Sequence, residues 1–185
     1  MRRQMSLDYL KDRFGIIQKE PTIDPKMIVI HHTHSGSFQS AFWTFQPVKI
    51  RGKLRYPKAG RLNLSAHFLV DRAGRIYRLI PENIFGRHII GIGYMAIGIE
   101  NVGGTKRFPL TYEQLKANVA LVKYLKARFP GIKWLIGHHE YLKFKKTPLW
   151  KEKDPKYLTY KPDPGWRFMR NLRNRVKHLN LVSEP

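Results

Sequence analysis

Short apolar runs alternate along this chain with longer amphipathic stretches. Met27–Ile30 is fully apolar, as a buried central strand should be, and it leads directly into His31 and His32. Ala96–Glu100 and Lys133–Ile136 are two further short runs of this kind. Strands separated by helices in this way predict an α/β fold.

A hairpin and a long loop lie between the first two of these runs. Ala66–Val70 and Arg75–Ile80 flank a four-residue segment of turn composition that ends in glycine, which predicts a β-hairpin. Thr44–Leu64 is basic, contains Pro and Gly, and shows little periodicity. We expect that segment to be a long loop near the functional site.

Two helices are predicted in the second half of the chain. Thr111 and Gln114 have the spacing of a capping box, and they open an amphipathic stretch that Pro130-Gly131 ends. A last helix is predicted from about Trp166 to Leu179, with apolar residues on one face and Arg and Lys on the other.

Length and composition limit the possible architecture and ligands. With 185 residues, 42% of them hydrophobic, the chain can fill one core, so we expect one domain. Cysteine is absent, which excludes disulfides and thiolate metal ligands. Any bound metal must therefore be held by His, Asp or Glu.

The charge of the chain is strongly positive. It contains 35 Lys and Arg against 13 Asp and Glu, a formal net charge of +22. Such a surface attracts polyanions, among them nucleic acid, the anionic membrane surface and acidic envelope polymers. Specific nucleic-acid binding is not expected, because neither zinc-finger spacing nor an aromatic RNA-binding signature accompanies the charge.

Two histidine pairs and an aspartate indicate a metal site. His31-His32 and His138-His139 each follow an apolar run, and Asp163 lies in a Lys-Pro-Asp-Pro-Gly segment downstream. Two imidazoles and one carboxylate suit zinc and leave a fourth position open, which implies catalysis. Neighbouring strand residues point to opposite faces, so only one of His31 and His32 reaches a given site, and the apolar pattern does not say which.

Five blocks in fixed order carry a family resemblance. They are MIVIHHT (27–33), LSAHFLVDRAGRIYRLIPE (64–82), AIGIENVGG (96–104), IGHHE (136–140) and KPDPG (161–165). Together they resemble the zinc-dependent N-acetylmuramoyl-L-alanine amidases, the family that also contains T7-type lysozyme and the peptidoglycan recognition proteins. The resemblance implies a single mixed β-sheet with helices packed on both faces and a groove holding one zinc ion (Zn2+). It further implies an N-terminal extension (1–24) followed by a zinc amidase domain (25–181).

Carried over by position, the resemblance assigns a role to each key residue. His31, His138 and Asp163 become the zinc ligands, and Glu100 and Lys161 the catalytic residues. The T7-type enzymes use a Tyr where this chain has Ala66, which strengthens the case for Glu100.

Four other histidines receive lesser roles. His67 and His88 are candidates for binding substrate or orienting ligands from behind the site, with a surface position as the alternative for His88. His32 and His139 are expected to be hydrogen-bonded structural residues.

One departure concerns the last ligand. Asp163 lies 25 residues after His138, farther than in relatives, and the basic, aromatic segment between them contains a competing Asp154. We favour Asp163 because Lys161 and Gly165 complete the family motif around it and nothing comparable surrounds Asp154.

The expected activity is zinc-dependent hydrolysis of the amide between N-acetylmuramic acid and L-alanine in peptidoglycan or muropeptides. The alternative within the family is a peptidoglycan-binding protein that does not cut, and a more distant one is a nucleic-acid-binding protein. The substrate favours the cell envelope as the location. A cytoplasmic location is the alternative, because the N-terminus lacks the apolar stretch of a signal peptide.

Overall fold

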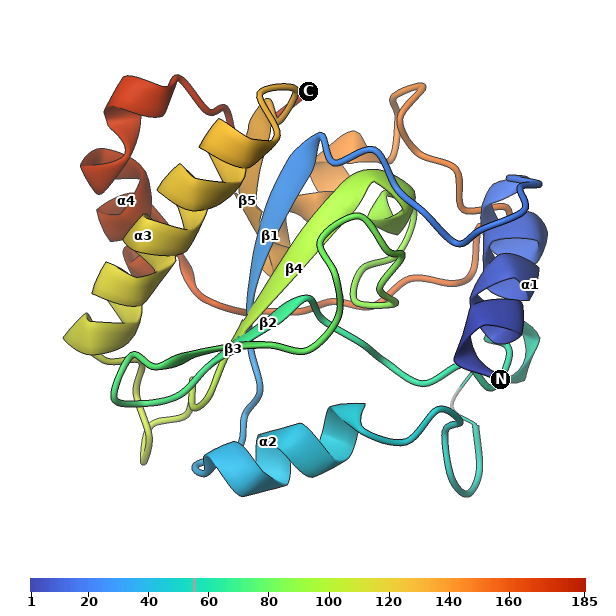
Figure 1. Ribbon diagram of the computed structural model, residues 1–185, viewed down its shortest axis with the longest axis horizontal. Helices are drawn as coiled ribbons and strands as arrows, with labels where there is room; N and C mark the ends of the chain where they lie inside the picture. The colour runs from blue at the N-terminus through green and yellow to red at the C-terminus, as the bar shows by residue number, and fades with distance from the viewer. Residues whose placement is uncertain (55) are drawn as a thin grey trace.

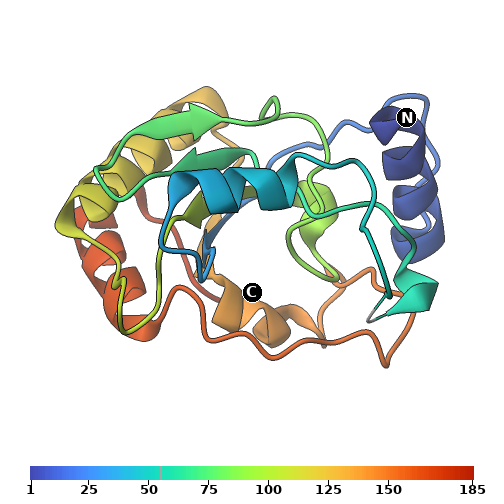
Figure 2. The same ribbon diagram turned by 90° about the horizontal axis from the view of Figure 1, so that it is seen from below.

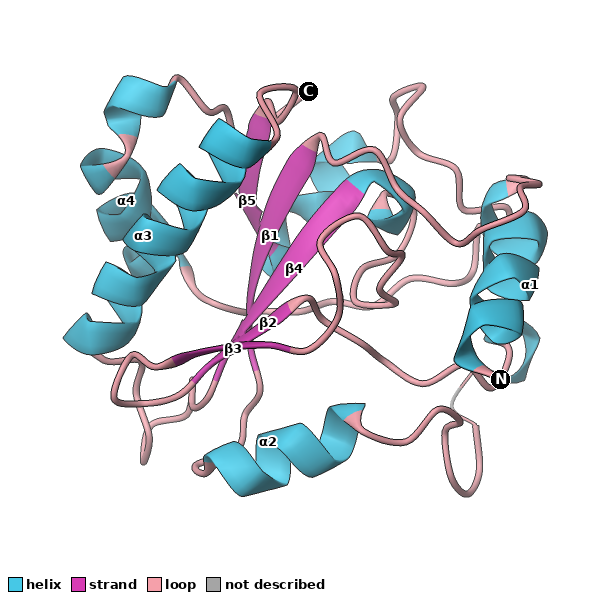
Figure 3. Cartoon of the chain, viewed as in Figure 1, coloured by secondary structure: helices cyan, strands magenta, loops and turns pink. Residues whose placement is uncertain are grey.

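The computed structural model describes residues 1–54 and 56–185 and contains one five-stranded sheet at its centre (Figures 1 and 3). Its spatial order is β3-β2-β4-β1-β5. The strands are β1 (Met27–His32), β2 (Phe68–Val70), β3 (Ile76–Arg78), β4 (Ala96–Asn101) and β5 (Trp134–Gly137). The three predicted apolar runs are β1, β4 and β5. β4 and β1 lie inside the sheet, and β5 forms one of its edges.

Helices surround the sheet. The α-helices are α1 (Arg2–Phe14), α2 (Phe38–Phe45), α3 (Tyr112–Arg128) and α4 (Trp166–Arg175). Short 3₁₀ helices are η1 (Pro57–Ala59), η2 (Gly93–Met95), η3 (His138–Phe144) and η4 (Lys177–Leu179). Within the described ranges, none of these helices combines the length and apolar character needed to cross a bilayer.

The pairing of the strands confirms the predicted mixed sheet. β1 runs parallel to both β4 and β5, β2 runs parallel to β4, and β2 and β3 form the predicted antiparallel hairpin. In this register His31 pairs with Glu100, and Ile30 pairs with Gly137. Three strands therefore bring their carboxyl ends, and the residues that follow, to the same edge of the sheet.

Each face of the sheet is covered differently. Ile28 and Ile30 of β1 are fully buried in one core cluster together with residues of α3 and α4. Met27 and Val29 point the other way and pack in a second cluster with Tyr141 and Phe144 of η3. Helices thus cover both faces, as predicted, but only the first face has long α-helices. His31 continues the Met27–Val29 side, so the site is built on the face that η3 covers.

The N-terminal helix is part of the packed domain. α1 lies at the opposite end of the molecule from α3 and α4 (Figures 1 and 2). Tyr9, Leu10 and Phe14 of α1 are buried in the main core, and both aromatic rings contact Phe85. Residues 1–24, predicted as an extension, therefore contribute a helix to the same core as the rest of the chain.

Two predicted boundaries need correction. The segment 44–64 is mostly irregular, as expected, but its first residues belong to α2, and η1 interrupts it; Arg55 lies outside the described residues. The last helix is shorter than predicted: α4 ends at Arg175, and η4 covers 177–179. Val176 leaves helical geometry at this break, while its side chain stays in the core.

A buried ion pair joins α1 to the segment before the last metal-ligand candidate. Arg13 Nη2 lies 2.5 Å from Glu152 Oε1, and the two side chains are 8% and 0% exposed. We expect Glu152→Ala to lower the free energy of unfolding by about 3–5 kcal/mol, because it leaves a buried guanidinium without its partner. Urea unfolding checks this.

The control for this prediction is Glu20→Ala. It breaks the Arg3–Glu20 pair, whose side chains are 54% and 59% exposed, and we expect no measurable change because solvent screens that pair. Equal effects of the two variants would contradict the importance of the buried pair.

Candidate metal centre

Three side chains converge at the carboxyl edge of the sheet. His31 is the fifth residue of β1, His138 directly follows β5, and Asp163 precedes α4. His31 Nδ1 lies 3.0 Å from His138 Nδ1 and 3.3 Å from Asp163 Oδ2, and His138 Nδ1 lies 3.1 Å from the same oxygen. All three residues are buried. The group has the donor atoms and spacing to hold a metal ion.

A chain of hydrogen bonds sets the tautomer of His31. The ring of His88 bonds through Nε2 to the carbonyl oxygen of Ala96 at 3.0 Å, so Nε2 carries the proton and Nδ1 accepts. That acceptor lies 3.1 Å from His31 Nε2, which must then donate. Neutral His31 is left with its lone pair on Nδ1, the atom that faces His138 and Asp163. The network therefore presents His31 in the form that binds a metal.

Burial supports the same protonation state. The pKa of His31 is lowered to about 4 by burial and by the neighbouring His138. The pKa of His88 lies well below its usual value because the ring is buried beside His31. Both rings are therefore neutral at pH 7, as a metal ligand and its hydrogen-bond partner require.

A glycine leaves the space for the His88 ring. A Cβ at Gly98 would come within 2.7 Å of His88 Cγ, so any other residue at this point of β4 would displace the ring. On the backbone side of Gly98, its N–H donates to His67 Nδ1 at 2.9 Å, and His67 Nε2 donates to the carbonyl oxygen of Ile84.

These bonds decide the position of His67. Its ring is 0% exposed and both nitrogens bond to backbone groups, so a ligand in the cavity has no access to it. Of the two roles predicted for His67, direct contact with substrate is therefore not supported, because the ring does not line the cavity; it lies behind the site, where it supports the strand next to His88. His88 itself lines the cavity at 7% exposure, which excludes a surface position.

Asp163 reaches the site from a long inserted segment. The backbone carbonyl of Asp163 accepts bonds from the N–H of His139 at 3.0 Å and from its Nδ1 at 2.9 Å. His139 therefore has the structural role that was predicted. Tyr141 closes the base of the insertion, because its hydroxyl donates to the carbonyl of Thr159 at 2.7 Å and accepts from the N–H of that residue at 3.0 Å.

The competing Asp154 lies elsewhere. It is only partly buried, and its Oδ1 accepts a bond from the N–H of Lys156 in a local turn. It belongs neither to the metal group nor to the residues that line the cavity. Because the insertion loops out and returns at Tyr141 and Thr159, the extra length does not displace Asp163.

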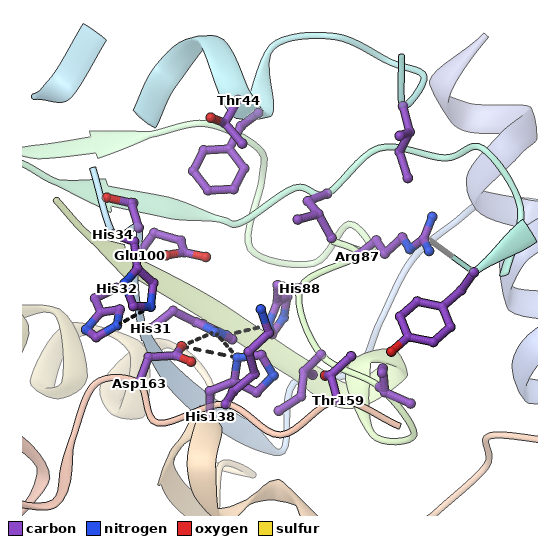
Figure 4. Close-up of a pocket in the computed structure, with 18 of the residues that line it drawn as sticks. His31, His32, His34, Thr44, Arg87, His88, Glu100, His138, Thr159 and Asp163 are labelled. Atoms are coloured by element: carbon purple, nitrogen blue, oxygen red, sulfur yellow. Dashed lines mark hydrogen bonds and ion pairs between the residues drawn. The ribbon is translucent and has the colours of Figure 1, made fainter. Parts of the chain in front are cut away.

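A cavity of about 440 Å3 opens over the three residues (Figure 4). Glu100 and Lys161, the predicted catalytic residues, both line it. Glu100 is 9% exposed, and its Oε2 has no hydrogen-bond partner among the described residues. Burial and the charge of Asp163 raise the pKa of Glu100 to about 8, against the opposing effect of Lys161. This carboxyl group is therefore available for proton transfer near neutral pH.

The pKa of Asp163 is shifted in the opposite direction to that of Glu100. Burial would raise its pKa, but the hydrogen bond from His138 and the nearby ring of His31 outweigh this and hold the pKa below its usual value. The two carboxyl groups of the site thus differ strongly in basicity, which is typical of a pair with separate roles.

Other cavity residues were not predicted. Tyr9 of α1, Arg87 and Tyr157 form its far end, where Arg87 Nη2 donates to Tyr157 Oη at 3.0 Å and the guanidinium lies 4.9 Å from the centre of the Tyr9 ring. Tyr9 and Tyr157 belong to the N-terminal helix and the insertion, and no sequence pattern connects those two segments. Arg87 could have been suspected only as the neighbour of His88.

His32 and His34 also line the cavity, outside the metal group. Their Nε2 atoms lie 3.0 Å apart, and His34 adopts the left-handed backbone conformation, with φ of 56°. His32 is therefore hydrogen-bonded rather than a ligand, in line with its predicted structural role.

Fold and site together define an α/β protein with a buried His, His, Asp centre at the carboxyl edge of its sheet. Residues 21–165 match the family described as N-acetylmuramoyl-L-alanine amidase (Amidase_2), so the chain belongs to that family. The match includes all three ligand candidates and leaves out α1. No curated protein matches the chain in sequence.

Solved structures with the same fold include amidases and recognition proteins. The N-acetylmuramoyl-L-alanine amidase LysC from Clostridium intestinale URNW is 24% identical, with a TM-score of 0.58 over 84% of this chain and 87% of its own. Apis mellifera PGRP-SA is 18% identical, with a TM-score of 0.58 over 89% of each chain. Human PGRP-IBETAC, solved in complex with glycosamyl muramyl pentapeptide, is 17% identical, with a TM-score of 0.54 over 82% of this chain and 84% of its own. At these identities the likeness establishes the fold.

The two aspartates can be separated by metal content. We expect Asp163→Ala to lose stoichiometric metal because it removes one of three converging ligands, while Asp154→Ala keeps it. Elemental analysis after dialysis against a weak chelator measures both. Loss of metal from the Asp154 variant with retention in the Asp163 variant would reverse the assignment.

The role of His88 can be measured through metal affinity. His88→Ala removes the acceptor that orients His31, and we expect affinity for the metal to fall about 10- to 100-fold, as for other hydrogen-bond partners of ligands. Competition with a chromophoric chelator gives the affinity. His34→Ala, a change in the same cavity without contact to a ligand, is the control and should leave affinity unchanged.

Proposed function

We propose that this protein is a zinc-dependent amidase that cleaves the bond between N-acetylmuramic acid and L-alanine in peptidoglycan or muropeptides. The observation that carries the proposal is the buried His31, His138 and Asp163 group together with Glu100, whose Oε2 has no hydrogen-bond partner in the described part of the chain, in the same cavity. Membership of the amidase family supports the reaction class.

The donor set fits zinc. Two neutral imidazoles and one carboxylate are ligands that zinc accepts, and three protein ligands leave a position for water or substrate. Held by His31, His138 and Asp163, zinc would lower the pKa of a water molecule and polarise the carbonyl of the amide.

Glu100 can act as the general base and then the general acid of the reaction. Hydrolysis adds the oxygen of water to the carbonyl carbon, breaks the C–N bond and transfers one proton to the leaving nitrogen. A buried carboxylate with a raised pKa takes a proton from the attacking water more readily than an exposed one and can return it to the amine. The products are a carboxylate on the lactyl group and a free amino group on L-alanine.

Lys161 supplies a positive charge to the same cavity. Lys161 lines the cavity together with Glu100 and Asp163, and from there its ammonium group can stabilise the negative charge that develops on the carbonyl oxygen. Lys53 and Arg87 also line the cavity, so basic side chains outnumber the two carboxylates. This balance favours substrates that carry carboxylates, as stem peptides do, and it suits an envelope substrate.

A peptidoglycan-binding protein without activity is the second candidate. Human PGRP-IBETAC, a structural neighbour, was solved in complex with glycosamyl muramyl pentapeptide. The complete ligand triad and the available Glu100 favour cleavage over binding alone.

The test is hydrolysis of a soluble muropeptide by the intact chain and two variants. We expect Glu100→Gln to lower kcat about 10²- to 10⁴-fold because the proton acceptor is lost. Lys161→Met should lower kcat about 10²- to 10³-fold because the oxyanion loses its stabilising charge. Both variants should retain zinc.

Lys156→Met is the matched control for Lys161. Lys156 is an exposed lysine of the same segment outside the cavity, and its loss should leave kcat unchanged. Muropeptide binding without product release by the zinc-loaded intact chain would favour the binding protein. Full activity in Glu100→Gln would remove Glu100 from the mechanism.

A further inference from the structure

The outward face of α4 carries positive charge that the metal centre does not use. α4 contains four arginines and no acidic residue. The inward side of α4 packs against the core, where Met169 and Leu172 are buried. The exposed Trp, Arg and Lys residues of α4 and of η4, which follows it, form a set that we call the α4 face: Trp166, Arg167, Arg170, Arg175 and Lys177.

These charges are not neutralised within the protein. Arg173, on the inner side of the helix, pairs with Glu140 and donates to the carbonyl of Leu135. By contrast, among the described residues no carboxylate lies within ion-pair distance of Arg167, Arg170 or Arg175. The fold thus uses one arginine of the helix to anchor β5 and leaves the other three exposed to solvent.

Exposed aromatic rings stand among these cations. Trp166 is 63% exposed, and the guanidinium of Arg170 lies 4.8 Å from the centre of its ring. Tyr112, at the start of α3, is 61% exposed, and the centre of its ring lies 5.6 Å from the guanidinium of Arg175 and 5.4 Å from Lys116, which is itself paired with Glu113. Each ring lies beside an arginine, and this combination of an exposed ring and a cation suits a partner that is anionic and partly apolar.

We propose that the α4 face binds the surface of an anionic phospholipid bilayer. Arginine forks match phosphate oxygens, and basic residues close to a negatively charged bilayer each contribute to binding. Trp and Tyr are the side chains that favour the headgroup region, because they combine an apolar ring with a polar group. Nucleic acid also carries phosphates but is the less favoured partner. The rings already contact cations of the protein, and no motif that binds a nucleic-acid groove accompanies the helix.

The binding is peripheral. The apolar side of α4 is already packed against the core, so the helix cannot roll into the bilayer, and contact is limited to the charges and the two rings. None of the α4 face residues lines the cavity. The proposal is therefore independent of the amidase reaction.

The experiment measures binding of the full chain to vesicles. The probes are vesicles of phosphatidylglycerol and phosphatidylcholine in equal parts, vesicles of phosphatidylcholine alone, and a double-stranded DNA oligomer. The variant combines Arg167→Gln, Arg170→Gln and Arg175→Gln. The control, Lys11→Gln, Lys19→Gln and Lys58→Gln, removes the same charge from exposed lysines on or beside α1, at the other end of the molecule (Figure 1).

We expect the intact chain to bind the anionic vesicles, more weakly as salt increases, and not to bind vesicles of phosphatidylcholine alone. Each arginine lost should weaken binding about fivefold, so the triple variant should bind roughly 100-fold more weakly. The control should bind as the intact chain does, and Trp166→Ala alone should weaken binding several-fold. Cleavage of a soluble muropeptide and the thermal midpoint should not change in the triple variant, which verifies its fold.

Three results would overturn the proposal. Equal losses in the variant and the control would show that net charge, rather than the α4 face, attracts the bilayer. Binding to DNA that the triple variant loses, without binding to anionic vesicles, would assign the face to nucleic acid. Absence of binding to any of the three probes at low salt would leave the face without a polyanionic partner.

Discussion

The parallel alignment of β1, β4 and β5 is the constraint on which the site depends. Because these strands run in one direction and in a fixed register, His31, Glu100 and His138 emerge at the same edge and on the same face. A shift of one residue in β1 would turn His31 to the opposite face of the sheet. The hydrogen bonds of the ladder therefore position the chemistry before any contact within the site is made.

Two segments outside this sheet give the site its enclosure. α1 and the insertion before Asp163 meet through the buried pair of Arg13 and Glu152, and each places a tyrosine at the far end of the cavity. Tyr141 and Thr159 close the insertion on itself, which allows its length to grow without moving Asp163. The cavity is thus shaped by parts of the chain that the metal centre itself does not require.

Burial then sets the protonation of the groups at the centre. The same apolar surroundings keep His31 neutral and Glu100 a weak acid, while the hydrogen bond from His138 keeps Asp163 ionised. One environment therefore yields a ligand set suited to a cation beside a group suited to proton transfer. Gly98 contributes by its lack of a side chain, since only that space admits the ring of His88, which sets the tautomer of His31.

The sequence by itself determined the strands, the capping box of α3, the α/β class and the ligand candidates, because apolar periodicity and motif spacing are local properties of the chain, and the family resemblance added the mixed sheet. It also pointed to Asp163 over Asp154 through the residues around it. The apolar pattern left His31 and His32 equivalent, and only the family motif favoured His31. The tertiary structure decided which face of β1 meets the centre, that His67 is sealed behind His88, and that α1 packs into the core. These outcomes depend on which face of β1 the insertion covers and on contacts between residues far apart in the chain, and such contacts leave no periodic pattern in the sequence.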